Sequence, residues 1–384
     1  KSQDVNYDDI LGGNLNTITT AVPFLLISPD SRSGAMGDVG VATAPDAASM
    51  HWNPAKLSFT KDDIGVSVSI VPWLRELVPD INLQYIGGYY KLNNNEALGY
   101  ELRYFSLGDI TFTDNTGNVI GQYKPNELAL GTSYSRKLSR DFSIAISGRY
   151  IYSNLTGGQS AGGTETIAGQ SIAADISTFY TRPISIADNK SDLSFGMNIS
   201  NIGNKISYTE TITRDFIPIN LRLGTDLTTE IDEYNKFSFA IDLNKLLVPS
   251  PPLYDENGDM IAGKDPEVSV VSGMFQSFGD APGEIDENGN PVPGSIFKEE
   301  MREINISTGF EYWYANQFAL RAGYFHEHDT KGGRKYLTFG SGVKYNVFAL
   351  DFSYLISTSN IGGSNPLANT MRFTLVFDLG SMGN

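Results

Sequence analysis

Residues 192–201 read DLSFGMNISN, and the alternation in this stretch decides the fold. Large apolar side chains take every second position, namely Leu193, Phe195, Met197 and Ile199. Because successive side chains of a β-strand point to opposite faces, the stretch predicts a strand with one apolar face and one small or polar face. A run of about ten residues is also the length that a tilted strand needs to cross the hydrocarbon layer of a membrane.

The same pattern, with small lapses, recurs in fourteen segments of the chain. These segments are residues 64–71, 81–91, 96–106, 127–138, 141–152, 170–180, 192–201, 220–229, 236–244, 303–312, 317–326, 336–345, 348–355 and 371–379. A soluble β-sandwich shows similar alternation, but its strands are usually only about five or six residues long. Bacterial single-chain outer-membrane barrels have an even number of strands. The sequence therefore predicts an all-β fold, a transmembrane barrel of fourteen antiparallel strands.

The connections between these segments are sorted by length. Those after even-numbered segments are short, such as 139–140 and 346–347, and only 181–191 is longer. Those after odd-numbered segments are mostly long, above all 246–302. Short periplasmic turns and long extracellular loops are typical of outer-membrane barrels, and a sandwich has no reason to sort its loops this way. We therefore expect a barrel that is integral to the outer membrane, in contact with its lipid, and with both termini in the periplasm.

Composition excludes several classes of protein. No stretch approaches the roughly 18 to 20 apolar residues of a transmembrane helix, so a helical membrane protein is excluded. The chain has no cysteine, which removes disulfide scaffolds, thiolate catalysis and thiolate metal sites. Its formal net charge of −16 disfavours nucleic acid as a partner. No signal peptide precedes Lys1, so the chain begins after cleavage or is not exported, and the strand pattern favours cleavage.

Few residues offer catalytic or metal-binding chemistry. Of the three histidines, two lie in the run His326-Glu327-His328-Asp329, the only cluster of metal-ligand types. We interpret this run as the solvated tip of an extracellular loop, with metal binding as the alternative. Three segments rich in Asp and Asn, at 113–118, 254–259 and 285–290, have the oxygens that calcium prefers. They lack the Glu that an EF-hand needs, and their Asn-Gly pairs favour hairpin turns, with weak calcium binding as the alternative. We expect no enzyme and no cofactor.

The connection 246–302 concentrates acidic charge. It holds eleven acidic residues against three basic ones, for a net charge of −8, and seven prolines. Proline resists regular strand pairing, so we expect an irregular loop, either ordered or mobile. Loops of this length in a compact domain are usually functional, although a solvated surface flap is the alternative. The residues that we expect to bind a partner here are Asp255, Glu256, Asp259, Glu284, Asp286 and Glu287.

The polar faces of the segments carry charges of both signs. The inward-facing set is Glu101, Arg103, Arg149, Arg222, Asp226, Asp242, Arg321, Lys344, Asp351 and Arg372. Opposite charges inside a barrel pair with one another and with a plug, or they line an aqueous pathway. The sequence leaves both arrangements open.

The segment before the first strand carries a recognisable motif. Asp46-Ala47-Ala48 followed by Trp52-Asn53-Pro54-Ala55 resembles the N-terminal hatch of FadL-type outer-membrane transporters, which are fourteen-stranded and plugged. The longer run PFLLISPDSRSGAMGDVGVAT at 23–43, continued to Lys56-Leu57, is similar to the PorV family, the FadL-like barrels of the Bacteroidetes type IX secretion system. The motif residues are Pro23, Asp30, Arg32, Gly34, Met36, Gly37, Asp38, Asp46, Trp52, Asn53 and Pro54. The resemblance implies a lumenal plug in residues 1–60 and the barrel in residues 61–384.

The resemblance also implies a role without catalysis. PorV-like proteins associate with the translocon barrel SprA, bind the C-terminal signal domain of exported cargo, and carry that cargo to the surface-attachment proteins. FadL-type proteins instead pass hydrophobic small molecules through a plug and a lateral opening. A transporter needs an apolar lumenal pocket, whereas the inward residues named above are small or charged. The sequence therefore favours the cargo shuttle, with FadL-like transport as the alternative.

Overall fold

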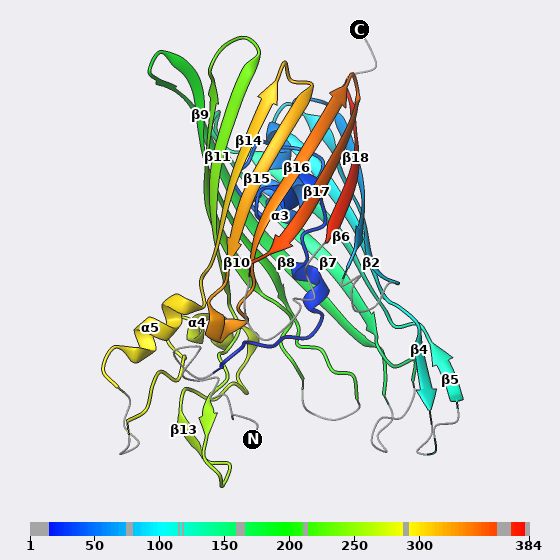
Figure 1. Ribbon diagram of the computed structural model, residues 1–384, viewed down its shortest axis with the longest axis vertical. Helices are drawn as coiled ribbons and strands as arrows, with labels where there is room; N and C mark the ends of the chain where they lie inside the picture. Colours follow the sequence, from blue (N-terminus) through cyan, green and yellow to red (C-terminus); the bar gives the residue numbers. More distant parts are fainter. Residues whose placement is uncertain are drawn as a thin grey trace, which may run out of the picture.

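A computed structural model describes residues 15–73, 80–113, 116, 119–158, 166–209, 214–286, 292–358 and 370–380. Fourteen strands in these ranges form one closed antiparallel barrel, which confirms the predicted fold (Figure 1). The barrel strands are β1 (Ile64–Pro72), β2 (Ile81–Asn93), β3 (Glu96–Leu107), β6 (Asn126–Lys137), β7 (Phe142–Asn154), β8 (Gly169–Ile186), β9 (Asn189–Gly203), β10 (Asn220–Glu230), β11 (Asn235–Leu246), β14 (Asn305–Tyr314), β15 (Phe318–His326), β16 (Lys335–Tyr345), β17 (Phe348–Ser357) and β18 (Met371–Leu379). The ring closes where β1 pairs with β18, with Ile64 opposite Leu379.

The alternation in the sequence separates the two faces of this wall. Large apolar residues face outward, and side chains such as Ile146, Ile172 and Leu320 are more than 60% exposed. Residues of the opposite parity, such as Ser147 and Asp175, are buried in the lumen. An apolar exterior around a polar interior is the arrangement that hydrocarbon stabilises and water does not. Among the described residues, no helix is long and apolar enough to cross a membrane.

The two ends of the barrel differ in their connections. At one end, which we call the short-turn end, turns of two to four residues join β2 to β3, β6 to β7, β8 to β9, β10 to β11, β14 to β15 and β16 to β17. The longer connections β3–β6, β7–β8, β9–β10 and β11–β14 gather at the opposite end, which we call the long-loop end (Figure 1). The predicted sorting of connection lengths is confirmed. Which end faces the cell exterior stays a prediction.

The predicted connection 181–191 is wrong. β8 and β9 continue through these residues and meet in a two-residue turn at Ala187 and Asp188, whose φ angles are 49° and 67°. Positive φ at both central residues is the backbone of a tight hairpin turn that follows the strand twist. The polar residues Arg182 and Lys190 hid the continuation, because a hairpin that projects beyond the wall has no apolar face to bury.

The long connections contain secondary structure of their own. β4 (Ile110–Thr113) and β5 (Val119–Tyr123) form a hairpin between β3 and β6. The β11–β14 connection contains the short hairpin of β12 (Leu253–Tyr254) and β13 (Met260–Ala262), followed by the helices α4 (Val270–Gln276) and α5 (Ser295–Arg302). Of the two expectations for this connection, ordered or mobile, its described part is ordered, and it is more regular than its proline content indicated.

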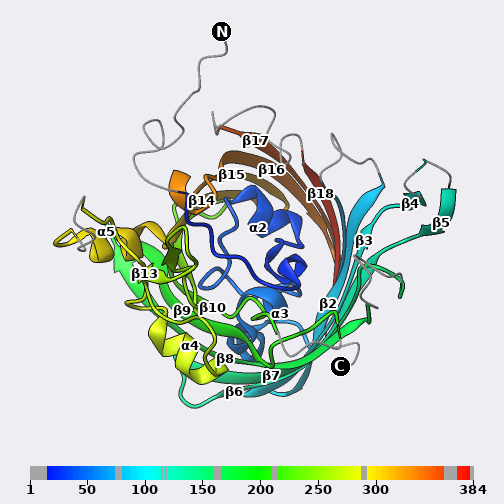
Figure 2. The ribbon, with the colours of Figure 1, turned by 90° about the horizontal axis from the view of Figure 1, so that it is seen from below.

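Residues 15–60, which we call the lumenal segment, start among the loops at Asn16 and then lie inside the ring of strands. It contains η1 (Pro23–Leu26), α2 (Ser31–Ala35), α3 (Ser49–Trp52) and η2 (Pro54–Phe59). Figure 2, which looks along the barrel, shows α2 and α3 surrounded by the strands. The backbone N–H of Asn16 donates to the carbonyl of Thr330 at the long-loop end, at 2.9 Å, whereas β1 starts at the short-turn end. The segment therefore runs the length of the lumen. The predicted periplasmic N-terminus falls on residues 1–14, outside the described residues, and stays a prediction.

Candidate functional site

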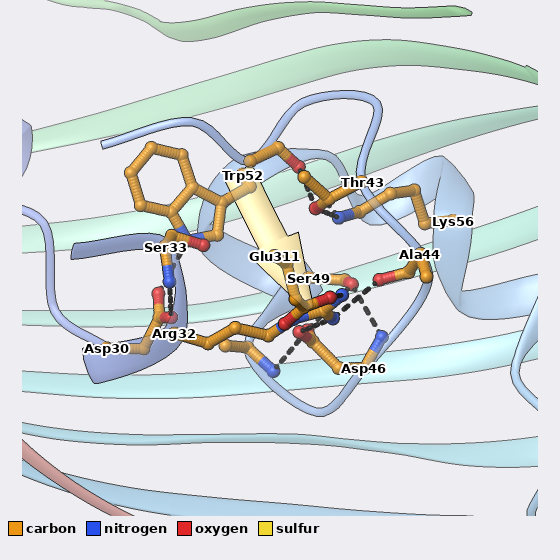
Figure 3. Close-up of polar contacts among 12 residues, drawn as sticks. Asp30, Arg32, Ser33, Thr43, Ala44, Asp46, Ser49, Trp52, Lys56 and Glu311 are labelled. Carbon is orange, nitrogen blue, oxygen red and sulfur yellow. Dashed lines mark hydrogen bonds and ion pairs between the residues drawn. The ribbon is translucent and has the colours of Figure 1, made fainter. Parts of the chain in front are cut away.

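Arg32 ties the lumenal segment to the barrel wall. Its Nε and Nη2 donate to the two carboxylate oxygens of Glu311 on β14, at 2.9 and 2.7 Å, and its Nη1 donates to Asp46 at 2.8 Å (Figure 3). Glu311 also accepts from Arg321 Nε at 2.7 Å, and Arg321 reaches Asp351 at 2.6 Å. Paired, charge-assisted hydrogen bonds of this geometry are the strong ones, and they satisfy charges that burial would otherwise penalise.

Asp30 and Asn53 fix the geometry of the turns in the segment. Asp30 caps α2 by accepting from the backbone N–H of Ser33 at 2.8 Å, and its second oxygen accepts from Trp52 Nε1 at 2.6 Å (Figure 3). Asn53 caps η2 by accepting from the backbone N–H of Ala55, at 3.0 Å, and donates to carbonyls of the segment and of β8. Side-chain caps satisfy backbone donors that short helices leave unpaired. These motif residues thus shape the segment.

Both the backbone conformation at position 37 and the space around it require glycine. Its φ is 71°, and a Cβ atom there would lie 2.6 Å from the backbone nitrogen of Tyr324 on β15. On the facing strand, a Cβ on Gly323 would lie 2.1 Å from the nitrogen of Gly37. The backbones of the segment and of the wall therefore touch directly, which only glycine permits.

Replacing Gly37 with Ala should lower the stability of the barrel by more than about 1 kcal/mol, because the new Cβ meets backbone and the φ angle is unfavourable. Gly148→Ala is the matched control, since no atom lies within 4 Å of a Cβ there, and it should change stability by less than about 0.5 kcal/mol. Urea unfolding midpoints in detergent measure both effects. Equal midpoints for the two variants would contradict the assigned contact.

The inward charges of the wall hold the segment at further points. Asp242 accepts from the backbone N–H groups of Gly40 and Val41 at 2.8 and 3.0 Å. Arg103 donates to the carbonyls of Phe24 and Leu25 at 3.2 and 2.6 Å. Of the two arrangements that the sequence left open, the structure shows these charges paired with the lumenal segment.

Other inward charges pair with one another. Arg149 binds both Glu101 and Asp175, at 2.7 and 3.0 Å. Lys344 pairs with Asp378 at 2.8 Å. Glu311 and Asp175 are absent from the set chosen by sequence, although their parity within their strands places them on the polar face.

Two cavities lie in the lumen, and the segment forms part of the wall of each. The cavity at the long-loop end has a volume of about 650 Å³, with Phe24, Phe105 and Phe325 beside Arg222 and Arg372. The other has a volume of about 540 Å³ and includes the Arg32 and Glu311 cluster. The expectation that inward residues are small or charged is wrong for the long-loop half. There the inward side chains of several strands are apolar, such as Leu83, Phe105 and Ile151, and beside Ile151 the outward side chains Tyr150 and Tyr152 are aromatic as well.

The acidic residues chosen in the β11–β14 connection do not form one site. Asp255 shapes the β12–β13 turn by accepting from the N–H groups of Asn257 and Asp259, at 2.9 and 2.8 Å. Glu256 is exposed on the same hairpin, and Glu284 lies near Lys298 of α5 at 3.4 Å. Asp286 is exposed, and Glu287 lies outside the described residues. The hairpin expected at 254–259 is confirmed, while parts of 113–118 and 285–290 are outside the described ranges.

A different acidic cluster in this connection is buried. Lys245 of β11 pairs with Glu300 and Glu303, at 3.0 and 2.6 Å, and Lys331 pairs with Glu299 and Glu303, at 2.6 and 3.0 Å. Near them, burial raises the pKa of the Asp280 carboxyl to about 6. Several of the acids counted in the sequence are thus used inside the connection. The acidic surface that it presents is smaller than its net charge indicates.

The residues of the run 326–329 make separate contacts and do not form one site. Glu327 pairs with Arg334 at 2.7 Å, Asp329 pairs with Lys335 at 2.7 Å, and His328 caps the short helix η3 (Asp329–Lys331). Within the described ranges, no three His, Asp or Glu side chains are grouped as a metal site would need.

The sequence model of the type IX secretion system protein PorV matches residues 12–253, well over half of the chain. The chain belongs to the PorV family. This PorV-family protein is therefore an outer-membrane component of the type IX secretion system. No curated protein matches the chain.

Solved structures similar to this PorV-family chain are FadL-like barrels. The monoaromatic hydrocarbon channel CymD is 13% identical with a TM-score of 0.50, over 93% of this chain and 99% of that one. The toluene transporter TbuX of Ralstonia pickettii is 11% identical with a TM-score of 0.46, over 95% and 98%. A FadL homologue of Pseudomonas aeruginosa is 11% identical with a TM-score of 0.45, over 94% and 99%. At these identities the likeness concerns the fold alone.

Proposed function

We propose that this PorV-family protein binds the C-terminal signal domains of exported cargo at its long-loop end. It carries them from an SprA-like translocon barrel to the surface-attachment proteins, without catalysis. One observation carries the proposal: buried ion pairs hold the lumenal segment across the lumen, so the segment acts as a plug. An exported protein cannot pass through a lumen filled in this way, and the barrel must act through its surface.

The long-loop end offers the larger binding surface. Its β11–β14 connection is folded, with α5 fixed to the barrel by Lys245 and Lys331. Exposed carboxylates such as Glu256 and Asp259 project from the β12–β13 hairpin. A fixed surface binds with less loss of conformational entropy than a mobile loop, and exposed carboxylates steer a basic partner toward it. In the part of the chain that the structure describes, the short-turn end supplies tight turns and the β8–β9 hairpin.

The proposal requires the long-loop end to face the cell exterior. The chain has no cysteine, so single cysteines are clean probes. A cysteine at Asn257, exposed in the β12–β13 turn, should react with a membrane-impermeant thiol reagent on intact cells. A cysteine at Asn94, exposed in the β2–β3 turn, should react only after the outer membrane is opened. Labelling of Asn94 alone on intact cells would reverse the orientation.

Transport of hydrophobic small molecules is the second candidate function, and the lumenal cavity of about 650 Å³ is the observation that favours it. Its volume and its mixture of apolar and cationic residues suit a small amphipathic anion. Uptake of a labelled long-chain fatty acid into vesicles that contain the purified protein separates the two functions. The shuttle function predicts the same uptake as in protein-free vesicles.

A further inference from the structure

The helix α5 presents its apolar side chains away from the protein. Its acidic residues Glu299 and Glu300 point inward, to Lys331 and Lys245, and Glu300 also accepts from the backbone N–H groups of Asp280 and Ala281 at 2.9 and 3.0 Å. On the other side, Ile296, Phe297 and Met301 are exposed, Phe297 by 69%. A surface helix in water buries its apolar face and exposes its charges. α5 instead turns its acidic residues Glu299 and Glu300 toward the protein and exposes its large apolar side chains.

These exposed side chains form one wall of a groove on the outside of the barrel. The groove has a volume of about 610 Å³. Leu221 and Leu223 of β10 and Leu243 of β11 form its opposite wall, and Phe278 and Ile304 complete it. Figure 2 shows α5 outside the ring of strands. The groove thus lies between the outer wall of the barrel and a helix that projects beyond it.

The groove is continuous with the surface that faces lipid. Leu223 and Leu243 are paired across β10 and β11 and point outward, like the other large apolar residues of the wall. Lys245, the cation among the described residues that line the groove, is neutralised by Glu300 and Glu303, at 3.0 and 2.6 Å. None of these described lining residues has an unpaired charge that would select a charged partner. A volume within the roughly 300–1,000 Å³ of small-ligand sites, lined by aliphatic and aromatic side chains, suits a hydrocarbon chain.

We propose that this groove binds an acyl chain of a membrane lipid, and that α5 lies at the membrane surface with its apolar side in contact with lipid. The buried ion pairs fix the helix on its polar side, and lipid covers its apolar side, as in interfacial amphipathic helices. This lipid site is independent of cargo binding. A result that contradicts it would not contradict the proposed function.

Lipid contact is tested by fluorescence quenching in vesicles. Single cysteines at Phe297 and Met301 carry an environment-sensitive fluorophore, and the purified protein is reconstituted in phosphatidylcholine vesicles with a nitroxide on the acyl chain. Cysteines at Ile172, on the outer face of β8, and at Asn257, in the β12–β13 turn, are the lipid-exposed and water-exposed references. Quenching at Phe297 and Met301 should match that at Ile172. Quenching no stronger than at Asn257 would overturn the proposal, and it is also the result expected if a protein partner occupies the groove.

Bound lipid is tested directly by native mass spectrometry of the purified protein. Replacing Ile296 and Met301 with Ser should reduce the number of lipid molecules that copurify. Replacing Val271 and Phe275 of α4 with Ser is the matched control, because both are exposed and neither lines the groove, and it should leave that number unchanged. The same lipid count in wild type and in both variants would also overturn the proposal.

Discussion

Replacing Glu311 with Gln should destabilise the barrel by about 3–5 kcal/mol, the usual cost of removing one partner from a buried ion pair. Glu311 is buried and binds Arg32 and Arg321 together, so its loss leaves two guanidinium groups each short of a counter-charge. Gln has nearly the same size as Glu and keeps one acceptor oxygen. The loss of stability therefore reports the missing charge rather than a change in packing. The measurement is the urea midpoint for unfolding in detergent.

Asp109→Asn is the matched control for this acid-to-amide change. Asp109 pairs with Lys124 at 3.6 Å, and both side chains are more than half exposed, so the pair should contribute less than about 1 kcal/mol. A second readout follows the lumenal segment itself. A cysteine at Ala48, buried in the wild-type lumen, should become reactive to thiol reagents in the Glu311→Gln protein. An unreactive Ala48 cysteine and an unchanged midpoint would show that Glu311 does not hold the segment.

Removing residues 252–298 should reduce secretion of most cargo several-fold while the barrel still assembles. The deletion contains no barrel strand, and it keeps Glu300 and Glu303 as partners for Lys245. Long surface loops of this kind are usually removed at small cost in stability. If the connection binds cargo or translocon, secretion falls several-fold and heat-resistant barrel in the outer membrane stays at its wild-type level.

Shortening the β8–β9 hairpin is the control for this deletion, since it trims exposed residues at the opposite end. Removing residues 184–190 should leave secretion unchanged. Wild-type secretion of several cargo proteins by the 252–298 deletion would eliminate this connection as the binding site. Secretion lost in both variants would point to a general defect in assembly.

The alternation of apolar residues made the barrel predictable, because lipid outside and a polar lumen inside impose the same period of two on every strand. The alternation did not identify strand residues where the chain extends beyond the wall of the barrel. Arg182 and Lys190 lie in the strands of a hairpin beyond the wall, and their polar side chains did not mark them as strand. α4 and α5 were missed within a proline-rich connection. For α5 the reason is that its position depends on contacts with Lys245 and Lys331, which are distant from it in sequence.

The motif of the lumenal segment was visible in the sequence, but the contacts of its residues were not. That Arg32 meets Glu311, or that Gly37 lies against Tyr324, depends on the position of the segment along the barrel axis. The position of Glu311 in the alternation of β14 places its side chain in the lumen, but it does not identify the residue that the side chain contacts. The apolar half of the lumen was missed for a related reason: where both faces of a strand are apolar, the inward one carries no signal of its own.

Direct binding of a signal domain tests the central claim. The purified protein in lipid nanodiscs should bind an isolated C-terminal signal domain of a secreted protein saturably. The same preparation lacking residues 252–298 should bind it at least several-fold more weakly. Binding that is absent for several signal domains, or that is undiminished by the deletion, would contradict cargo binding at the long-loop end.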